Sequence, residues 1–363
     1  MHRIVPVRRV CLVATLVACI MAAGSSAAIG RAKPAAPASR FGIADGGDLQ
    51  ALGGRERGRY LDAVKGTGAG WIRIGIYWSI IQRRGPTAYD WAPFDRVVKA
   101  ARRRGLRVLG TMLYAPAWAR ERGTPSSAPP ADPRAFAAFA GRAARHFRPR
   151  GVHAYEIWNE PNIAGFWPGG PDPARYTQLL KASYTAIKRA DRSATVVSGG
   201  LSPYAAYGAA DSQSVNPLTF LERMYANGAR GSMDAVGWHP YNFPWGLGYY
   251  AWSAWSQMAS TSPSARSIMK ANGDGKKKIW ATEWGAPTGS SSQSMSEAAQ
   301  AQLIKTGLER LKAWSWAGPS FLYNFRDKGT NLSDREQNFG LVRHDWSPKP
   351  AYEAYRSMAA RRR

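Results

Sequence analysis

Eight short apolar segments alternate along this chain with longer amphipathic segments, and this alternation constrains the possible folds more than any other feature. The apolar segments have the length of buried strands and cover residues 41–45, 71–78, 107–114, 153–159, 195–201, 235–241, 278–283 and 320–325. The segments with a helical pattern cover residues 48–65, 93–104, 132–147, 173–190, 214–228, 257–271, 293–314 and 349–360. Strands that alternate with helices in this way form parallel sheets.

Eight strand–helix units in 363 residues favour a closed sheet over an open one. The alternative is an open, doubly wound sheet, which normally begins with a Gly-rich phosphate-binding loop. Residues 42–47 contain three glycines but no G-x-G-x-x-G pattern. We therefore predict an α/β protein with a single (β/α)8 TIM barrel over residues 41–363.

The first 28 residues have the pattern of a secretory signal peptide. Arg3, Arg8 and Arg9 precede an apolar run over residues 10–23, and small residues follow at 24–28. The apolar run is too short to span a membrane comfortably, and no later stretch looks transmembrane. We expect a secreted protein in which residues 29–40 form a flexible Pro/Ala lead-in. The alternative is a lipoprotein anchored through Cys19.

Both cysteines, Cys11 and Cys19, lie within this leader. The secreted protein would then have no disulfide, no thiol nucleophile and no thiolate metal site. The spacing of His, Asp and Glu suggests no metal site, and no H-E-x-x-H motif is present. We expect neither a metal nor a cofactor.

The chain is strongly basic, with 50 Lys and Arg against 24 Asp and Glu. Removal of the leader takes away three Arg and changes the formal net charge from +26 to +23. No nucleic-acid-binding module is visible, so we expect no specific nucleic-acid partner. Such a charge on an exported protein favours adsorption to polyanions such as acidic polysaccharides. We expect a monomer.

Two glutamates close predicted strands. Glu160 ends the fourth strand and Glu283 ends the seventh. Alternation along a strand should place Glu156, Trp158 and Glu160 on one face, and Glu283 on the same face as the residues two and four positions before it. Catalytic groups of such barrels lie at these strand ends. Two carboxylates facing each other cost energy in a resting protein, and glycoside hydrolysis is a reaction that uses such a pair.

Several motifs carry a resemblance to a known group of enzymes. They are Trp158-Asn-Glu-Pro-Asn162, Thr282-Glu-Trp-Gly285, His239-Pro-Tyr241, Gly85-x3-Tyr-Asp-Trp91, Pro116-Ala-Trp118, Tyr323-x2-Arg-Asp327 and Lys349-Pro-Ala-Tyr352. Together they resemble the clan A glycoside hydrolases, and specifically the cellulase-like families five and thirty-nine. The resemblance covers nearly the whole chain after the leader.

The resemblance implies a role for each matching residue. Glu160 would be the general acid/base and Glu283 the nucleophile, while Asn159 would bind the sugar 2-hydroxyl. Arg73 and Tyr241 would bind Glu283 and keep it ionised. The remaining residues expected to line the site are His239, Tyr114, Trp118, Trp284 and Tyr323. Many relatives have Trp at the position of Tyr323, so this chain departs from the pattern there.

Other roles remain open for several of these residues. Glu156 should be a structural ion partner of Arg73, and Arg73 could serve only that pair. His153 should be a structural histidine, and His239 could be one too. The aromatic residues expected in loops on the site face, about half of them buried, are Phe166, Trp167, Phe243, Trp245, Tyr249, Tyr250, Trp252 and Trp255.

The sequence therefore predicts a secreted retaining glycoside hydrolase that cleaves an O-glycosidic, β-linked bond in a poly- or oligosaccharide by double displacement. The alternative is a non-catalytic barrel that binds carbohydrate or a polyanion. Such a protein could lose a carboxylate, whereas this chain has both.

Overall fold

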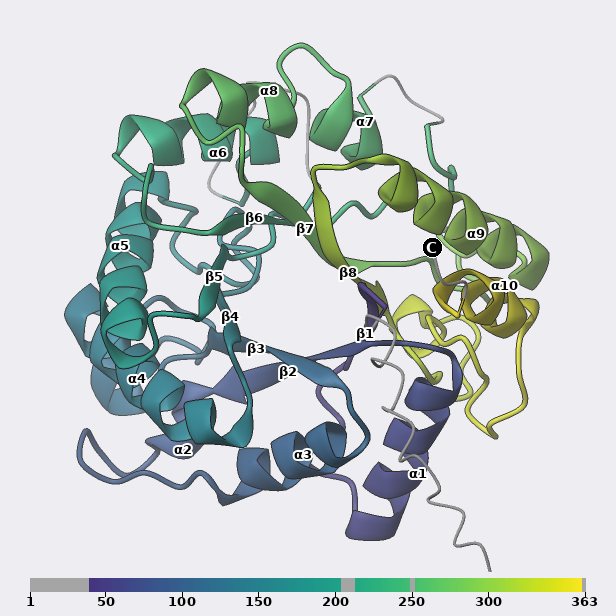
Figure 1. Cartoon of the computed structure of the whole chain (residues 1–363), viewed down its shortest axis with the longest axis horizontal. Helices are drawn as coiled ribbons and strands as arrows, with labels where there is room; N and C mark the ends of the chain where they lie inside the picture. Colours follow the sequence, from purple (N-terminus) through teal and green to yellow (C-terminus); the bar gives the residue numbers. More distant parts are fainter. Residues whose placement is uncertain (1–38, 204–212, 249–251, 361–363) are drawn as a thin grey trace, which may run out of the picture. The chain divides into compact units, whose positions relative to one another are not determined.

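A computed structural model of the chain describes residues 39–203, 213–248 and 252–360. Eight parallel strands form a closed barrel in sequence order, and β8 pairs with β1 (Figure 1). The strands are β1 (Phe41–Ala44), β2 (Trp71–Tyr77), β3 (Arg107–Leu113), β4 (Ala154–Ile157), β5 (Thr195–Ser198), β6 (Ala235–Trp238), β7 (Lys278–Trp284) and β8 (Ala317–Tyr323). The predicted (β/α)8 barrel is confirmed.

Helices follow the strands and pack on the outside of the barrel (Figure 1). They are α1 (Gly54–Gly66), α2 (Trp78–Ile81), α3 (Ala92–Arg103), α4 (Pro133–Phe147), α5 (Pro173–Ala190), α6 (Pro217–Ala226), α7 (Ala254–Ala259), α8 (Ala265–Ala271), α9 (Glu297–Ala313) and α10 (Pro350–Ala359). Short 3-10 turns cover Ala117–Ala119, Arg148–Arg150 and Arg335–Gln337.

Local sequence explains where several helices begin and end. The side chains of Asp132 and Asp172 accept hydrogen bonds from the first backbone N–H groups of α4 and α5, and a proline follows each aspartate. A cap of this kind satisfies N–H groups that have no partner inside the helix. Gly105 and Gly228 follow α3 and α6 with φ of 70° and 80°, a left-handed conformation that glycine adopts without strain.

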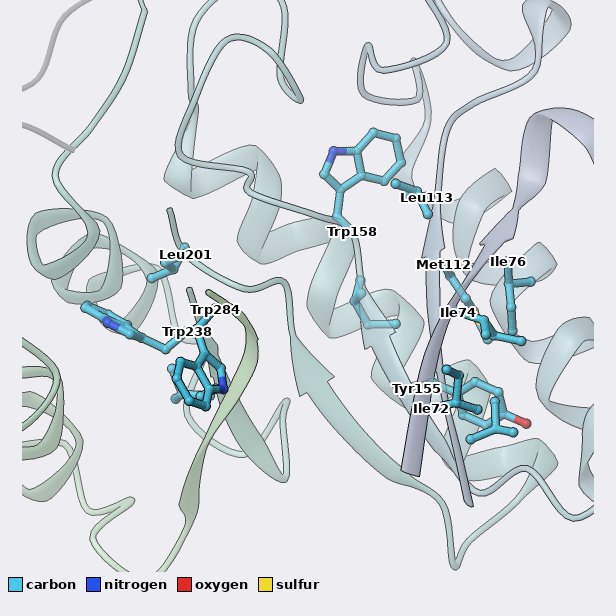
Figure 2. Packing of buried hydrophobic residues seen from close by; sticks show 14 of the residues in the cluster. Ile72, Ile74, Ile76, Met112, Leu113, Tyr155, Trp158, Leu201, Trp238 and Trp284 are labelled. Atoms are coloured by element: carbon cyan, nitrogen blue, oxygen red, sulfur yellow. The ribbon is translucent and has the colours of Figure 1, made fainter. Parts of the chain in front are cut away.

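The strands pack apolar residues on both of their faces, as expected for a parallel sheet covered by helices. Ile72, Ile74 and Ile76 belong to the large core between the strands and helices, and Figure 2 shows them side by side along β2. The opposite face of the strands fills the barrel interior with a smaller apolar cluster of Ala44, Trp71, Leu109, Ala154, Val197, Ala235, Trp280 and Phe321.

The interior changes from apolar to polar toward the carboxyl ends of the strands. Two residues beyond Trp71 on β2 stands Arg73, and two residues beyond Ala154 on β4 stands Glu156. A separation of two residues places side chains on the same face of a strand. The apolar cluster therefore forms a floor beneath a layer of charged groups.

Some element boundaries differ from the prediction. The predicted helix over residues 257–271 is two helices, α7 and α8, because Pro263 lies between them and has no N–H for a helical hydrogen bond. The first helix begins at Gly54 instead of residue 48, and β8 begins at Ala317 instead of residue 320. The predicted signal peptide and nearly all of the lead-in lie outside the described residues. In the part of the chain that is described, no helix is long and apolar enough to cross a membrane.

Candidate active site

A cleft of about 760 Å³ lies at the carboxyl ends of the strands. Its walls come from several βα connections, and its charged floor is the polar layer above the apolar cluster. The lining residues with direct relevance to chemistry are Arg73, Asn159, Glu160, Tyr241 and Glu283. The structure thus brings these five predicted site residues together in one cavity.

Arg73 joins three of the strands through its guanidinium group. Its Nε lies 2.7 Å from Glu156 Oε2, its Nη1 lies 2.7 Å from Glu283 Oε2, and its Nη2 lies 2.7 Å from Asn159 Oδ1. The two roles that the sequence left open for Arg73 are therefore both present, because one side chain pairs with Glu156 and with Glu283. Thr111 and the Gly200 backbone N–H also donate to Glu156, which is fully buried.

Glu283 receives a hydrogen bond on each carboxylate oxygen. Arg73 donates to Oε2, and the Tyr241 hydroxyl lies 2.7 Å from Oε1. Burial alone would raise the pKa of Glu283, but the charge of Arg73 and, with smaller effect, the charge of His239 and the Tyr241 hydrogen bond hold this pKa below its usual range. Glu283 is therefore ionised at neutral pH and oriented by two donors.

Glu160 is held from a different side. Its Oε1 lies 2.8 Å from Nδ1 of His239, and its backbone N–H donates to the Gly200 carbonyl at 3.1 Å. His239 is fully buried and is not among the residues that line the cleft. We infer that His239 acts on Glu160 from behind and does not contact a ligand in the cleft itself.

Gly200 lies at the junction of three strands. A Cβ atom at this position would overlap the ring of His239, which follows β6, and the hydroxyl of Thr282 on β7. Its N–H and carbonyl bind Glu156 and Glu160, which belong to the region of β4. The absence of a side chain at Gly200 is therefore what allows these groups to approach one another.

The alternation argument was wrong in detail for both glutamates. Trp158 does not share a face with Glu156, because β4 ends at Ile157 and Trp158 takes a φ of 69°. Its ring packs in the outer core against Phe136 and Trp167, at ring-centroid distances of 5.6 Å and 5.9 Å. Glu160 reaches the cleft through a second left-handed residue conformation, with a φ of 42°.

On β7, Ile279 and Ala281 belong to the outer core, whereas Trp280 belongs to the interior cluster. Simple alternation would therefore direct Glu283 outward. The pairing of β7 with β8 shifts register between Ala281 and Trp284. This irregularity leaves Glu283 in the cleft and Trp284 in the outer core.

The other predicted substrate-binding residues divide into two groups. Tyr114 and Tyr323 line the cleft. Burial, and then the charge of Glu283, raise the pKa of both hydroxyls, so that both remain protonated donors. Trp118 and Trp284 do not line it. Trp284 is buried against Trp255, and Trp118 packs on Trp78 with its indole N–H bonded to a backbone carbonyl.

The loop aromatics also take different positions. Phe166 and Phe243 line the cleft, whereas Trp167 and Trp255 are buried. Trp245 and Trp252 are exposed. Tyr249 and Tyr250 lie outside the described residues. His153, far from the cleft lining, binds Asp191 at 2.6 Å, in agreement with a structural role.

The sequence analysis missed several residues of the cleft. Asp45 directly follows β1 and could have been found from its place at a strand end. Burial, and then the charge of Asp48, raise its pKa to about 7. Arg335, Glu336 and Phe339 also line the cleft, from the long connection after β8, where no sequence signal marks them.

A buried ion pair holds that connection in place. Lys349 Nζ lies 2.8 Å from Asp327 Oδ1 and also donates to Thr288 Oγ1 and the Asn338 carbonyl. Asp327 in turn accepts the backbone N–H of Gly340. Two motifs that matched the family pattern, at 326–327 and 349–352, thus meet to fix the segment that carries Phe339.

Within residues 39–203, 213–248 and 252–360, no group of three or more His, Cys, Asp or Glu side chains could hold a metal ion.

A (β/α)8 barrel that presents a glutamate from its fourth and another from its seventh strand to one cleft defines a glycoside hydrolase of clan A. The sequence model of the cellulase family, described as Cellulase (glycosyl hydrolase family 5), matches residues 47–320. The chain belongs to glycosyl hydrolase family 5 and is a glycosidase, a hydrolase acting on O-glycosyl compounds. A comparison with curated proteins gave no significant match.

Solved structures of glycoside hydrolases share the fold. A family 39 glycoside hydrolase from the gut symbiont Bacteroides cellulosilyticus WH2 is similar with a TM-score of 0.68 and 23% identity, over 88% of this chain and 63% of that chain. GH5_18 from Streptomyces cattleya, in complex with GlcNAc, has a TM-score of 0.64 and 16% identity, over 89% and 80%. An exo-β-1,4-mannosidase from Opitutaceae bacterium strain TAV5 has a TM-score of 0.60 and 17% identity, over 88% and 59%. This chain spans less than two thirds of the family 39 protein and of the mannosidase.

Proposed function

We propose that this protein is a secreted, retaining glycosidase that cleaves a β-linked poly- or oligosaccharide by double displacement. Glu283 is the nucleophile and Glu160 is the general acid/base. The observation that carries the proposal is the pair of hydrogen bonds from Arg73 and Tyr241 to the two oxygens of Glu283, which keep this carboxylate ionised and aimed. The β-1,4 specificity in the name of the mannosidase supports the choice of a β-linked bond.

In the first step, the Glu283 carboxylate attacks the anomeric carbon while the bond from that carbon to the leaving oxygen breaks. Glu160 gives its proton to the leaving oxygen. In the second step, a water molecule attacks the same carbon, Glu160 takes the proton of that water, and Glu283 leaves as a carboxylate. Two inversions at one carbon retain the configuration.

Asn159 is placed to bind the sugar beside the nucleophile. Its Oδ1 accepts from Arg73, which can only donate, so this bond identifies the amide oxygen. The NH2 group of Asn159 is then the part that can donate to a sugar hydroxyl. Phe166 and Phe243 supply apolar walls against which a sugar ring can pack.

Replacement of the nucleophile tests the proposal. Glu283→Ala should abolish turnover of an aryl β-glycoside while the folded state, followed by circular dichroism, is unchanged. Added azide should restore release of the aryl group and give a glycosyl azide of inverted configuration, because azide enters the space of the lost carboxylate. Full activity of Glu283→Ala without azide would contradict the assignment. A wild-type protein that binds sugars but turns over none would favour the non-catalytic alternative.

The secretory route rests on the sequence of residues 1–28 alone and has its own test. Mass spectrometry of the exported protein should find a mature N-terminus near residue 28. A chain that begins at a lipid-modified Cys19, and that a Cys19→Ser variant releases from the membrane, would establish the anchored form instead.

A further inference from the structure

The outer surface of α3 carries a row of cations far from the chemistry of the cleft. Arg96, Lys99 and Arg103 are all exposed, and their spacing of three and then four residues places them on one side of the helix. We call these three residues the α3 stripe. At 1.5 Å of rise per residue, the stripe runs for about 10 Å along the helix.

Two hollows lie along the α3 stripe, one on each side. The first, of about 350 Å³, lies between α3 and α1, which neighbour each other outside the barrel (Figure 1). The second, of about 580 Å³, lies toward Arg150. Lys99 and Arg103 line both hollows, and neither hollow shares a lining residue with the catalytic cleft.

The residues that line the two hollows carry an excess of positive charge. Their cationic lining residues are Arg57, Arg96, Lys99, Arg102, Arg103, Arg104 and Arg150. The only acidic lining residue among the described parts of the chain is Asp95, and it already pairs with Arg150 and His146. Asp62, nearby on α1, pairs with Arg104.

No ion pair joins the α3 stripe to any carboxylate in the described segments. Like charges at this spacing on a helix destabilise it slightly. The positive charge of the stripe also affects an arginine on α1, because burial and then the charge of Arg96 lower the pKa of Arg57. Repulsion among these cations lowers the stability of the free protein. A bound anionic ligand would neutralise their charge and remove this repulsion.

We propose that the α3 stripe and its two flanking hollows form a second, non-catalytic binding site for a linear anionic polysaccharide. A chain with one negative group per sugar presents charges at regular intervals, and such a chain fits a straight row of cations between two grooves. The large exposed apolar side chains of the described residues are Ile80, Trp118, Trp245, Trp252 and Leu332. None of them belongs to α1 or α3, so the surface offers no platform for the stacked bases of a single-stranded nucleic acid. A glycan is therefore the favoured polyanion.

Substitution of the α3 stripe by uncharged residues tests the site. The variant Arg96→Gln, Lys99→Gln, Arg103→Gln removes three positive charges from an exposed helix face and relieves repulsion there, so the protein should fold. Lys181→Gln, Arg189→Gln, Arg192→Gln is the matched control, because these three residues are also exposed and the net charge changes equally. Binding of the full-length protein to polygalacturonate is measured by fluorescence anisotropy across a salt series.

The stripe variant should bind polygalacturonate roughly 10-fold or more weakly at low salt, and its affinity should depend less steeply on salt, because fewer counterions are released. The control variant should bind like the wild type. Both variants should hydrolyse a neutral aryl glycoside at the wild-type rate. The binding measurement requires no turnover, so its result does not depend on the proposed catalytic roles. Equal loss of binding in both variants would overturn the site, because net charge alone would then explain it. Tighter binding of the stripe to duplex DNA than to polygalacturonate would overturn the choice of a polysaccharide.

Discussion

The hydroxyl of Tyr241 lies 2.7 Å from Oε1 of Glu283 and donates to it. Burial, and then the negative charge of Glu283, raise the pKa of Tyr241 well above its ordinary value, so the phenol keeps its proton at neutral pH. The same bond helps to hold the pKa of Glu283 down. Tyr241 thus stabilises the ionised form of Glu283, and Glu283 stabilises the protonated form of Tyr241.

Replacement of Tyr241 by Phe should therefore move the acid limb of the pH profile. Loss of the hydrogen bond removes one contribution that lowers the pKa of Glu283, so this pKa should rise. Because Glu283 must be ionised to attack, the acid limb of kcat/KM should shift to higher pH, with the alkaline limb less affected. The measurement is kcat/KM against pH for both proteins. An acid limb that stays in place would mean that this limb reports another group.

Replacement of Glu160 by Ala should separate substrates by their leaving groups. Poor leaving groups need the proton from Glu160, so their hydrolysis should slow by roughly 10²- to 10⁴-fold. Activated aryl glycosides should still form the covalent intermediate, which should then accumulate because no base activates water. Mass spectrometry of the intact protein checks this. Equal slowing of the first step for both kinds of substrate would contradict the acid/base role.

Replacement of Lys349 by Met should destabilise the protein strongly. Asp327 would remain buried without its cation, and loss of one member of a buried pair typically costs about 3–5 kcal/mol. Chemical denaturation measures the effect. The double variant Asp327→Asn, Lys349→Met removes both charges and should recover part of the loss. A double variant as unstable as the sum of the two single ones would show that the pair does not interact energetically.

The protein that lacks the predicted leader should melt at the same temperature with and without a reductant. Residues after the predicted leader contain no cysteine, so a reductant has no disulfide to act on. Thermal unfolding followed by circular dichroism is sufficient. A shift in Tm on adding dithiothreitol would indicate that the chain is processed differently and retains Cys11 or Cys19.

The order of elements could be predicted from sequence because period and length distinguish strands from helices without any knowledge of contacts. The direction in which side chains point at the strand ends could not be predicted in this way. Trp158 and Trp284 were both expected to face the site, yet each packs in the outer core. Left-handed residues and a shift of strand register decide these directions, and both depend on how the neighbouring strand pairs.

The proposed catalytic pair, Glu160 and Glu283, could be selected from the sequence because two like charges facing each other at strand ends cost energy in a resting protein. Arg73 was found because it interrupts an alternating apolar strand. Arg335 and Phe339 follow no such rule, since they belong to an irregular connection whose path is set by the distant Lys349. Sequence patterns locate residues on regular elements, whereas a loop acquires its position from tertiary contacts.

Gly200 lies just after β5, a strand that supplies neither of the proposed catalytic groups. The packing around the site nevertheless restricts this position to glycine. Any side chain there would push His239 and Thr282 aside, and the displacement would pass through His239 to Glu160. Substrate preference can diverge through the loops around the cleft, which have room to change. The position of Gly200, two residues beyond the end of β5, has no such room. In any descendant of this enzyme that still hydrolyses glycosides, Gly200 should be among the slowest positions to evolve.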